Sequence, residues 1–390
     1  MGSRGKAKLF SPAWSALPSG EDGRGGKTKP GRRRKVQPGR RRKARTRRQK
    51  VVRWGVWICV ALLLAGAGTA GYAYWRLNHN ITSLDLSSIL SPGDDSGEMN
   101  ILVMGVDSRS GENGDLAGGD TDGTSRSDTT AVVHINQEHT KASVVWISRD
   151  TLVDIPRCTG SDGQTIPAQQ DAMFNSAYGE GGAACTVKTV EQLSGLELNH
   201  YVELDFSGFV GFVNDIGGVT ITTTEDIDDP DSGFDEPAGT HHLGGDEALA
   251  YVRTRHGVGD GSDLDRITLE QQMADAIITR LQSLGLAAHP KQAYNIASDL
   301  TKSVTTDSGL ASVNALLGLA GGMAGIGPSD VTQVTLPNEP APSDPNRVEP
   351  KEPEAGQVWD ALKKDQAIPS SIVGSQRQNP ADSKVSDGTS

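Results

Sequence analysis

Arginine and aspartate side chains recur in close pairs along the middle of this chain, where short apolar runs or helical patterns end. Arginine suits phosphate oxygens because its planar guanidinium donates two parallel hydrogen bonds. Aspartate suits Mg²⁺, a hard cation commonly held by carboxylates together with phosphate oxygens. The paired residues are Asp107, Arg109, Arg126, Asp128, Arg149, Asp150, Arg253, Arg255, Asp263 and Arg266. This set predicts a site for a phosphorylated substrate and Mg²⁺, with surface ion pairs as the alternative.

Familiar catalytic motifs of other kinds are absent. The chain has no glycine-rich phosphate loop, no His-Glu-x-x-His, no Gly-x-Ser-x-Gly and no paired-cysteine metal motif. The common hydrolase classes that depend on these motifs are therefore not indicated.

The elements that position the pairs alternate between strand and helix patterns. Short runs rich in Val, Ile and Thr predict strands at 100–106, 129–136, 142–148, 201–204, 219–223 and 331–336. Helical patterns cover 170–178, 187–193, 206–216, 244–253 and 264–284, with two or three more between 290 and 323. The expected fold is α/β, a mixed central β-sheet flanked by helices, and ligands collect at strand ends in such sheets.

A 22-residue apolar run without charge, Trp54–Trp75, precedes this domain. At 1.5 Å per residue it is long enough to cross a bilayer, and its aromatic ends match an interfacial belt. Residues 1–53 carry 19 Lys and Arg against two acids, whereas the remaining 337 residues carry 47 acids against 19 basic residues. We therefore expect one transmembrane helix, a cytoplasmic N-terminus and an extracellular domain at the cell membrane. A cleavable signal peptide is the alternative.

The basic stretch 32–48 could contact nucleic acid, but membrane orientation and contact with anionic lipid explain it more simply. We therefore expect membrane lipid, and no nucleic acid, among the partners. Two of the three cysteines, Cys158 and Cys185, lie on the outer side and predict a disulfide, with two free thiols as the alternative.

Composition divides the chain into five parts. They are a basic cytoplasmic segment (1–53), the transmembrane helix (54–75), a polar stalk (76–97), the domain at 98–336, and a Pro- and acid-rich tail (337–390). We expect that tail to be largely disordered, with one short helix near 355–365.

Six blocks appear in the order and spacing of the LytR-CpsA-Psr family, which this sequence resembles over about 98–285, and to 336 by extension. They read NILVMGVDSR, RSDTTAVVHI, VVWISRDTLVDIP, NSAYGEGG, FSGFVGFVNDIGGVTI and LGGDEALAYVRTRHGVGDGSDLDRITLEQQ. The Gly-, Ala- and Asp-rich composition and long basic N-terminus resemble an actinobacterial member.

The resemblance implies a membrane-anchored, Mg²⁺-dependent phosphotransferase of cell-wall assembly. Its substrates would be a glycopolymer on a polyprenyl pyrophosphate carrier and the C6 hydroxyl of N-acetylmuramic acid in peptidoglycan. Teichoic acid is one such polymer, and the sequence does not say which one is carried. Mn²⁺ is an alternative to Mg²⁺.

Roles carry over residue by residue. Asp107 and Asp128 would bind the metal, and Arg149, Asp128 and Arg255 would be catalytic. The pyrophosphate would lie against Arg126, Arg149, Arg253, Arg255, Arg266 and Gln271. Asp263 would bind an arginine or orient the acceptor. The general base is open between Asp128 and Asp150.

One departure weakens the outer edge of the implied phosphate site. Where the family often has Arg-Gln-Gln, this chain has Leu269, Glu270 and Gln271. Two other functions remain open: hydrolysis of the same carrier-linked substrates, and a non-catalytic regulatory or wall-binding role.

Overall fold

The computed structural model describes residues 47–91, 97–107, 126–160, 163–258, 263–285 and 289–376. At 47–53, 55, 107, 126–128 and 290 it describes the backbone alone. The chain divides within its first helix, between Leu63 and Leu64, into an N-terminal unit and a larger C-terminal unit. The first helix, α1 (Arg47–Asn80), contains a 25-residue stretch, Val56–Asn80, that is long and apolar enough to cross a membrane. This confirms the predicted apolar helix by length and composition.

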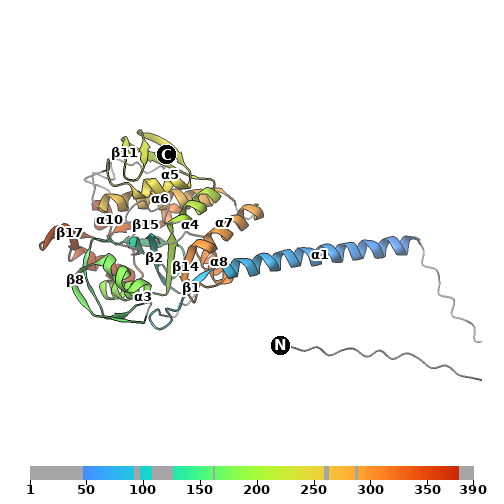
Figure 1. The fold of residues 1–390 in the computed structure, drawn as a ribbon, viewed down its shortest axis with the longest axis horizontal. Coiled ribbons are helices and arrows are strands. Elements are labelled where there is room, and N and C mark those ends of the chain that lie inside the picture. The colour runs from blue at the N-terminus through green and yellow to red at the C-terminus, as the bar shows by residue number, and fades with distance from the viewer. Residues whose placement is uncertain are drawn as a thin grey trace, which may run out of the picture. The chain divides into compact units, whose positions relative to one another are not determined.

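A seven-stranded mixed sheet forms the centre of the larger unit, as the strand patterns predict (Figure 1). Its strands, in spatial order, are β1 (Thr82–Leu84), β14 (Val304–Asp307), β9 (His200–Asp205), β2 (Met99–Asp107), β3 (Arg126–Ile135), β4 (Ala142–Trp146) and β15 (Val331–Thr335). β2 runs parallel to β9, and β4 runs parallel to β15, while β3 lies antiparallel between β2 and β4. Strands β9, β2, β4 and β15 therefore end at the same edge of the sheet, where β3 begins.

Both faces of the sheet are covered by helices. Side chains alternate between the two faces along each strand, and the strands place apolar side chains on both faces, which the helices bury. Along β2, Leu102, Met104 and Val106 pack into the main core, whereas Met99 and Ile101 enter a smaller cluster on the other face. Helices α3 (Phe174–Ser194) and α9 (Glu354–Lys363) complete the main core. On the opposite face lie α6 (Asp263–Ser283) and α8 (Val313–Gly322).

The remaining elements extend these layers. Helices α4 (Phe206–Asp215), α5 (Gly245–Arg253) and α7 (Pro290–Ser303) pack with α6 around a second core. The short helices are η2 (Pro328–Asp330) and α10 (Ser370–Gln376). The strands outside the main sheet form two-stranded sheets, and they are β5 (Leu152–Ile155), β6 (Cys158–Thr159), β7 (Thr165–Ile166), β8 (Gln169–Met173), β10 (Val219–Thr223), β11 (Ile227–Asp229), β12 (Phe234–Glu236), β13 (Gly239–Leu243), β16 (Asn338–Ala341) and β17 (Asp344–Pro350).

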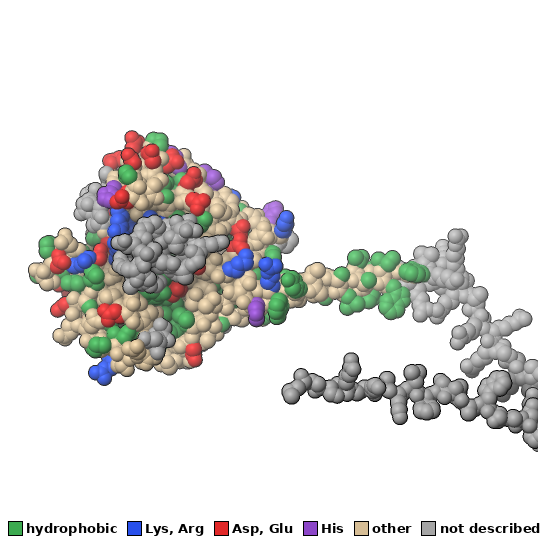
Figure 2. Space-filling model, viewed as in Figure 1, with side chains coloured by type: hydrophobic (Ala, Val, Ile, Leu, Met, Phe, Trp, Pro, Cys, Tyr) green, Lys and Arg blue, Asp and Glu red, His purple; other side chains and the backbone are tan. Residues whose placement is uncertain are grey.

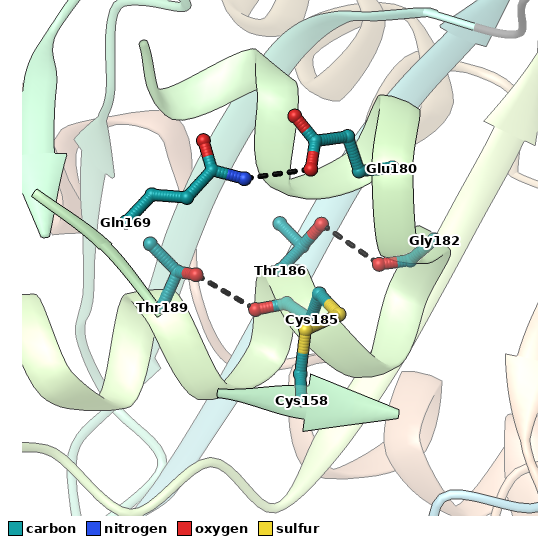
Figure 3. Close-up of a disulfide and its surroundings, with 7 residues drawn as sticks. All are labelled: Cys158, Gln169, Glu180, Gly182, Cys185, Thr186 and Thr189. Carbon is teal, nitrogen blue, oxygen red and sulfur yellow. Dashed lines mark hydrogen bonds between the residues drawn. A yellow bond between two sulfur atoms is a disulfide. The ribbon is translucent and has the colours of Figure 1, made fainter. Parts of the chain in front are cut away.

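The predicted disulfide between Cys158 and Cys185 is confirmed, and it joins strand β6 to helix α3 (Figure 3). The sulfur of Cys185 lies against Gly181, where an added Cβ would stand 1.8 Å from it, so the helix needs glycine at this position. The bond closes a separation of 27 residues, for which chain entropy gives a stabilisation of about 3–4 kcal/mol.

Three predictions about element boundaries are wrong. The stalk at 76–97 contains β1, which pairs with β14, and it places Leu86 and Leu90 in the main core. The helix expected at 170–178 begins at Phe174, because Gln169–Met173 pairs with β5 as strand β8. Strands β1 and β8 are short and polar, and each pairs with a strand that is not its neighbour along the chain, so neither shows an alternating apolar pattern in the sequence.

The tail expected to be largely disordered is also ordered between Asn338 and Gln376. Its α9 matches the short helix predicted near 355–365, but it buries Val358, Trp359 and Leu362 in the main core. Val348 of strand β17 forms an isolated parallel β-bridge with Thr151, which lies a few residues after the end of β4. Pro and acidic residues dominate the composition here, yet a few well-spaced apolar residues suffice to fix the segment. Residues 377–390 lie outside the described part.

We predict that Trp359→Ala lowers the free energy of unfolding by about 3–5 kcal/mol, because it removes a large side chain that is 3% exposed. Asp360→Asn, at an exposed neighbouring position on α9, should change it by less than about 0.5 kcal/mol. Urea unfolding of the full chain in detergent measures both. Equal effects of the two substitutions would show that α9 is not part of the core.

Candidate functional site

Three of the predicted arginines meet in a cavity of about 220 Å³ at the edge of the sheet where β2, β4 and β9 end. Arg253, Arg255 and Arg266 line it, as three of the predicted phosphate ligands should. Thr129 of β3 and Phe206, the first residue of α4, form part of its wall. Three guanidinium groups in one small cavity can hold a phosphate or diphosphate from several sides. We call this cavity the arginine pocket.

The carboxylate of Asp263 joins two of the predicted arginines. Its Oδ1 lies 3.2 Å from Nε of Arg149 and 2.9 Å from a terminal nitrogen of Arg266. Its Oδ2 accepts hydrogen bonds from the hydroxyl of Ser148, at 2.6 Å, and from the backbone N–H of Arg149, at 3.1 Å. Since Asp263 is only 5% exposed, these contacts replace water and fix the end of β4 against the start of α6. Asp263 thus pairs with Arg149 and Arg266, and its other expected role, orientation of the acceptor, stays a prediction.

Asp229 of β11, a residue that sequence analysis missed, holds the backbone at Arg255 just after α5. Its Oδ2 accepts hydrogen bonds from the backbone N–H groups of Arg255, at 2.6 Å, and His256, at 3.1 Å. Its Oδ1 accepts from the N–H of Asp231, at 3.0 Å. Burial alone would raise the pKa of Asp229, but these N–H groups outweigh it and lower the pKa to about 2.

The guanidinium group of Arg253 lies over the face of an aromatic ring. Its guanidinium carbon lies 5.1 Å from the centroid of the Phe206 ring, a cation–π distance. Phe206 is placed by the N-cap of α4, because Asp205 accepts a hydrogen bond from the N–H of Gly208 at 2.6 Å. The ring therefore supports the arginine without neutralising its charge.

Glu270, which replaces a residue of the usual family motif, lines the arginine pocket. It lies 3.3 Å from Nε of Arg266, one helical turn away, and accepts a 2.5 Å hydrogen bond from the hydroxyl of Thr129. The expectation that Gln271 lies in the same site is wrong. The side-chain amide of Gln271 donates a 3.2 Å hydrogen bond to the Thr335 hydroxyl. Gln271 lines a different cavity, described below. Positions 263, 266 and 270 share one helical face, and position 271 is about 100° further round.

Acidic side chains gather on the lobe that carries β11, and Asp231 of that lobe lines the arginine pocket. Figure 2 shows Asp and Glu side chains gathered on the lobe that carries β11 and β12, whose exposed acids include Glu225, Asp226, Asp228 and Asp235. Their negative charge opposes an anionic ligand, so we expect binding to be aided by a cation that accompanies the phosphate.

The predicted metal ligands Asp107 and Asp128 have side chains outside the described residues, as does Arg126. Their backbone positions are described: Asp107 ends β2 and pairs with Arg126, and the register shift falls beside Asp128. All three lie at the edge of the sheet that carries the arginine pocket. Two carboxylates from adjacent strands there are a donor set suited to Mg²⁺. Among described residues, the ligand atoms of Asp229, Asp231 and His256 also lie within 4.8 Å of one another. The carboxylate of Asp229 already accepts hydrogen bonds from three backbone N–H groups.

A second missed residue, Arg347 of β17, reaches the site from the tail. A terminal nitrogen of Arg347 donates a 2.6 Å hydrogen bond to Oδ1 of Asp150, whose other oxygen lies 3.9 Å from Nε of Arg149. Sequence analysis could not find it, since nothing near Arg347 indicates contact with a residue 197 positions earlier.

We predict that Arg347→Gln lowers the activity of this site on a phosphorylated substrate about tenfold, because Asp150 is then free to draw Arg149 away from the phosphate. In the double variant Arg347→Gln/Asp150→Asn, activity should recover. Steady-state kinetics of the full chain measures this, with the exposed Arg157→Gln as control. No recovery in the double variant would contradict the role assigned to Arg347.

We also predict that the stabilisation provided by Asp229 disappears in acid. Its pKa is lowered on folding, so the stabilisation is complete above about pH 4 and is lost as the pH falls towards 2. Asp229→Asn should cost about 2 kcal/mol at pH 6 and almost nothing at pH 2, as measured by urea unfolding at each pH. A cost that does not change with pH would refute the charge-based explanation.

Comparison with known proteins adds a family and a fold. The LytR_cpsA_psr family model matches residues 72–364. The cell wall biosynthesis protein LcpA of Corynebacterium glutamicum is 30% identical over 268 residues, which are 62% of this chain and 50% of LcpA. This chain therefore spans about half the length of LcpA. TagT of Bacillus subtilis, a polyisoprenyl-teichoic acid–peptidoglycan teichoic acid transferase, is 32% identical over 261 residues, 61% of this chain and 74% of TagT.

Solved structures agree with the fold. The crystal structure of B. subtilis TagV has a TM-score of 0.53 at 25% identity and covers 69% of this chain and 97% of TagV. A LytR-Csp2A-Psr enzyme from Actinomyces oris has a TM-score of 0.52 at 21% identity and covers 75% of this chain and 97% of that enzyme.

Proposed function

Since this chain belongs to the LytR_cpsA_psr family, in an actinobacterial form, we propose that it is a glycopolymer transferase of the cell wall. It takes a glycopolymer from a polyprenyl pyrophosphate carrier and attaches it to the C6 hydroxyl of N-acetylmuramic acid in peptidoglycan. The observation that carries this proposal is the arginine pocket, in which Arg253, Arg255 and Arg266 converge at the strand ends beside Arg149. The relatives named for teichoic acid transfer support the same class of substrate.

The chemistry is displacement at phosphorus. The acceptor oxygen forms a bond to the sugar-side phosphorus, the bond from that phosphorus to the bridging oxygen breaks, and polyprenyl phosphate leaves. In such transfers the protein contributes mainly position and charge neutralisation. Arg149, Arg253, Arg255 and Arg266 hold the phosphate oxygens as negative charge develops on the leaving group. Asp263 sets the direction of two of them.

The proton of the acceptor hydroxyl needs a base. Asp150 already accepts a hydrogen bond from Arg347, so we assign this role to Asp128 rather than to Asp150. Asp107 and Asp128 would hold Mg²⁺, or Mn²⁺, which neutralises phosphate charge when bound. Arg126 would contact the phosphate from the start of β3.

Membrane attachment through α1 suits this substrate, because the polyprenyl chain lies in the bilayer. The excess of positive charge before α1 favours a cytoplasmic N-terminus and an extracellular domain. Membrane lipid and peptidoglycan are then the surroundings of the site.

We predict that Arg149→Ala lowers transfer by about 100-fold or more, the scale of losing one donor to a developing charge. The full chain in detergent is incubated with a polyprenyl-pyrophosphate-linked sugar, Mg²⁺ and a peptidoglycan oligomer, and products are identified by mass spectrometry. The exposed Arg157→Ala is the matched control, and thermal unfolding checks that both variants are folded.

A phosphodiester-linked glycan adduct that is lost in Arg149→Ala would establish the transferase. Release of lipid phosphate without an adduct would identify a hydrolase of the same substrate. Unchanged transfer in Arg149→Ala would show that Arg149 does not take part in the reaction.

A further inference from the structure

A second cavity, of about 430 Å³, lies between α6 and the tail segment, and the phosphate chemistry gives it no role. It is about twice the size of the arginine pocket. One wall is the face of α6 that carries Leu264, Thr268 and Gln271, and the other is formed by residues between Asn338 and Gln376. We call it the tail groove.

The tail groove opens beside the arginine pocket. Thr335, the last residue of β15, lines the groove, and Thr129 of β3 lines the arginine pocket. Strand β4 lies between β3 and β15, so the strands that carry Thr129 and Thr335 are two strand spacings apart, roughly 10 Å. Helix α6 separates them, with Asp263, Arg266 and Glu270 on the side of the arginine pocket. Both therefore lie at the edge of the sheet where β4 ends and Arg149 follows.

The walls of the two cavities differ in charge. The groove is lined mainly by amide and hydroxyl side chains, including Gln271, Asn338, Gln357 and Ser371. Its Lys351 and Glu354 form a 2.9 Å ion pair and neutralise each other. Groups of this kind both donate and accept hydrogen bonds and carry no net charge. They match a ligand with many hydroxyl and amide groups, whereas an anion would find no excess of cations here.

The far wall is fixed to the sheet rather than loosely attached. The side-chain amide of Gln376 donates to the backbone carbonyl of Thr335 at 2.6 Å and accepts from its N–H at 2.8 Å. Ile372 on the same helix is buried in the main core. The groove is thus a preformed site, as small-molecule sites usually are.

We propose that the tail groove binds the sugar chain of the acceptor, a neutral stretch of N-acetylated glycan, and presents its hydroxyl to the phosphate held in the arginine pocket. This inference rests on the proposed transfer, since that reaction requires an acceptor glycan within reach of the phosphate. It gives the tail segment, and Gln271, a function separate from phosphate binding.

The test uses the full chain in detergent without donor, so that it does not depend on transfer. Isothermal titration calorimetry measures binding of a tetrasaccharide of alternating N-acetylglucosamine and N-acetylmuramic acid whose lactyl carboxyls are capped as amides, so that the glycan is neutral. Ser371→Trp fills the groove from an exposed position on α10, and Ser370→Trp places the same side chain on an exposed neighbour that does not line the groove. Ser371→Trp should weaken glycan binding by about tenfold or more, and Ser370→Trp by less than about twofold.

Inorganic pyrophosphate with Mg²⁺ serves as the probe for the arginine pocket. Its affinity should be unchanged in Ser371→Trp, and it should not displace the tetrasaccharide. Three results would overturn the proposal: no glycan binding by the wild type at millimolar concentration, displacement of the glycan by pyrophosphate, or equal weakening by both tryptophan variants. Absence of transfer in wild type with intact glycan binding would instead count against the proposed reaction alone.

Discussion

The carboxylate of Asp263 is the interaction on which the arrangement of the site depends. It connects the loop after β4, through Ser148 and Arg149, to the first turn of α6, through Arg266. A nearly buried carboxylate is costly unless it is paired, and here Oδ2 accepts two hydrogen bonds while Oδ1 lies within ion-pair distance of two guanidinium groups. The result is that a strand of the central sheet and a helix of the second layer share one fixed junction, with arginines on both sides.

Helix α6 uses its two faces for different chemistry. The face with Asp263, Arg266 and Glu270 is turned to the arginine pocket, and the face with Leu264, Thr268 and Gln271 is turned to the tail groove. A charged cavity and a neutral one can therefore lie side by side. The tail segment closes the groove with α10, and its Arg347 contacts Asp150, the residue after Arg149. A segment with the composition of a disordered tail thus packs against the edge of the sheet that carries the arginines.

Much of the fold was predictable because its central elements carry strong local patterns. Strands β2, β3, β4, β10 and β15, and helices α4, α5 and α6, fall within a few residues of their predicted ranges. Three predicted arginines line the arginine pocket, Arg149 joins them through Asp263, and the disulfide formed as expected. Asp229, Arg347 and the ordered tail were missed because each acts through partners distant in sequence.

The sequence by itself determined the apolar helix, the α/β layering, the family and the residue types suited to phosphate, since periodicity and ordered motifs are local properties. Only the tertiary structure decided which side chains share a cavity. Helical geometry turns Gln271 away from the arginines and puts Glu270 beside Arg266. Sheet order brings Thr335 within two strands of Thr129, and packing of Trp359 holds the tail against the core. These outcomes depend on contacts between residues far apart along the chain, for which the sequence contains no local signal.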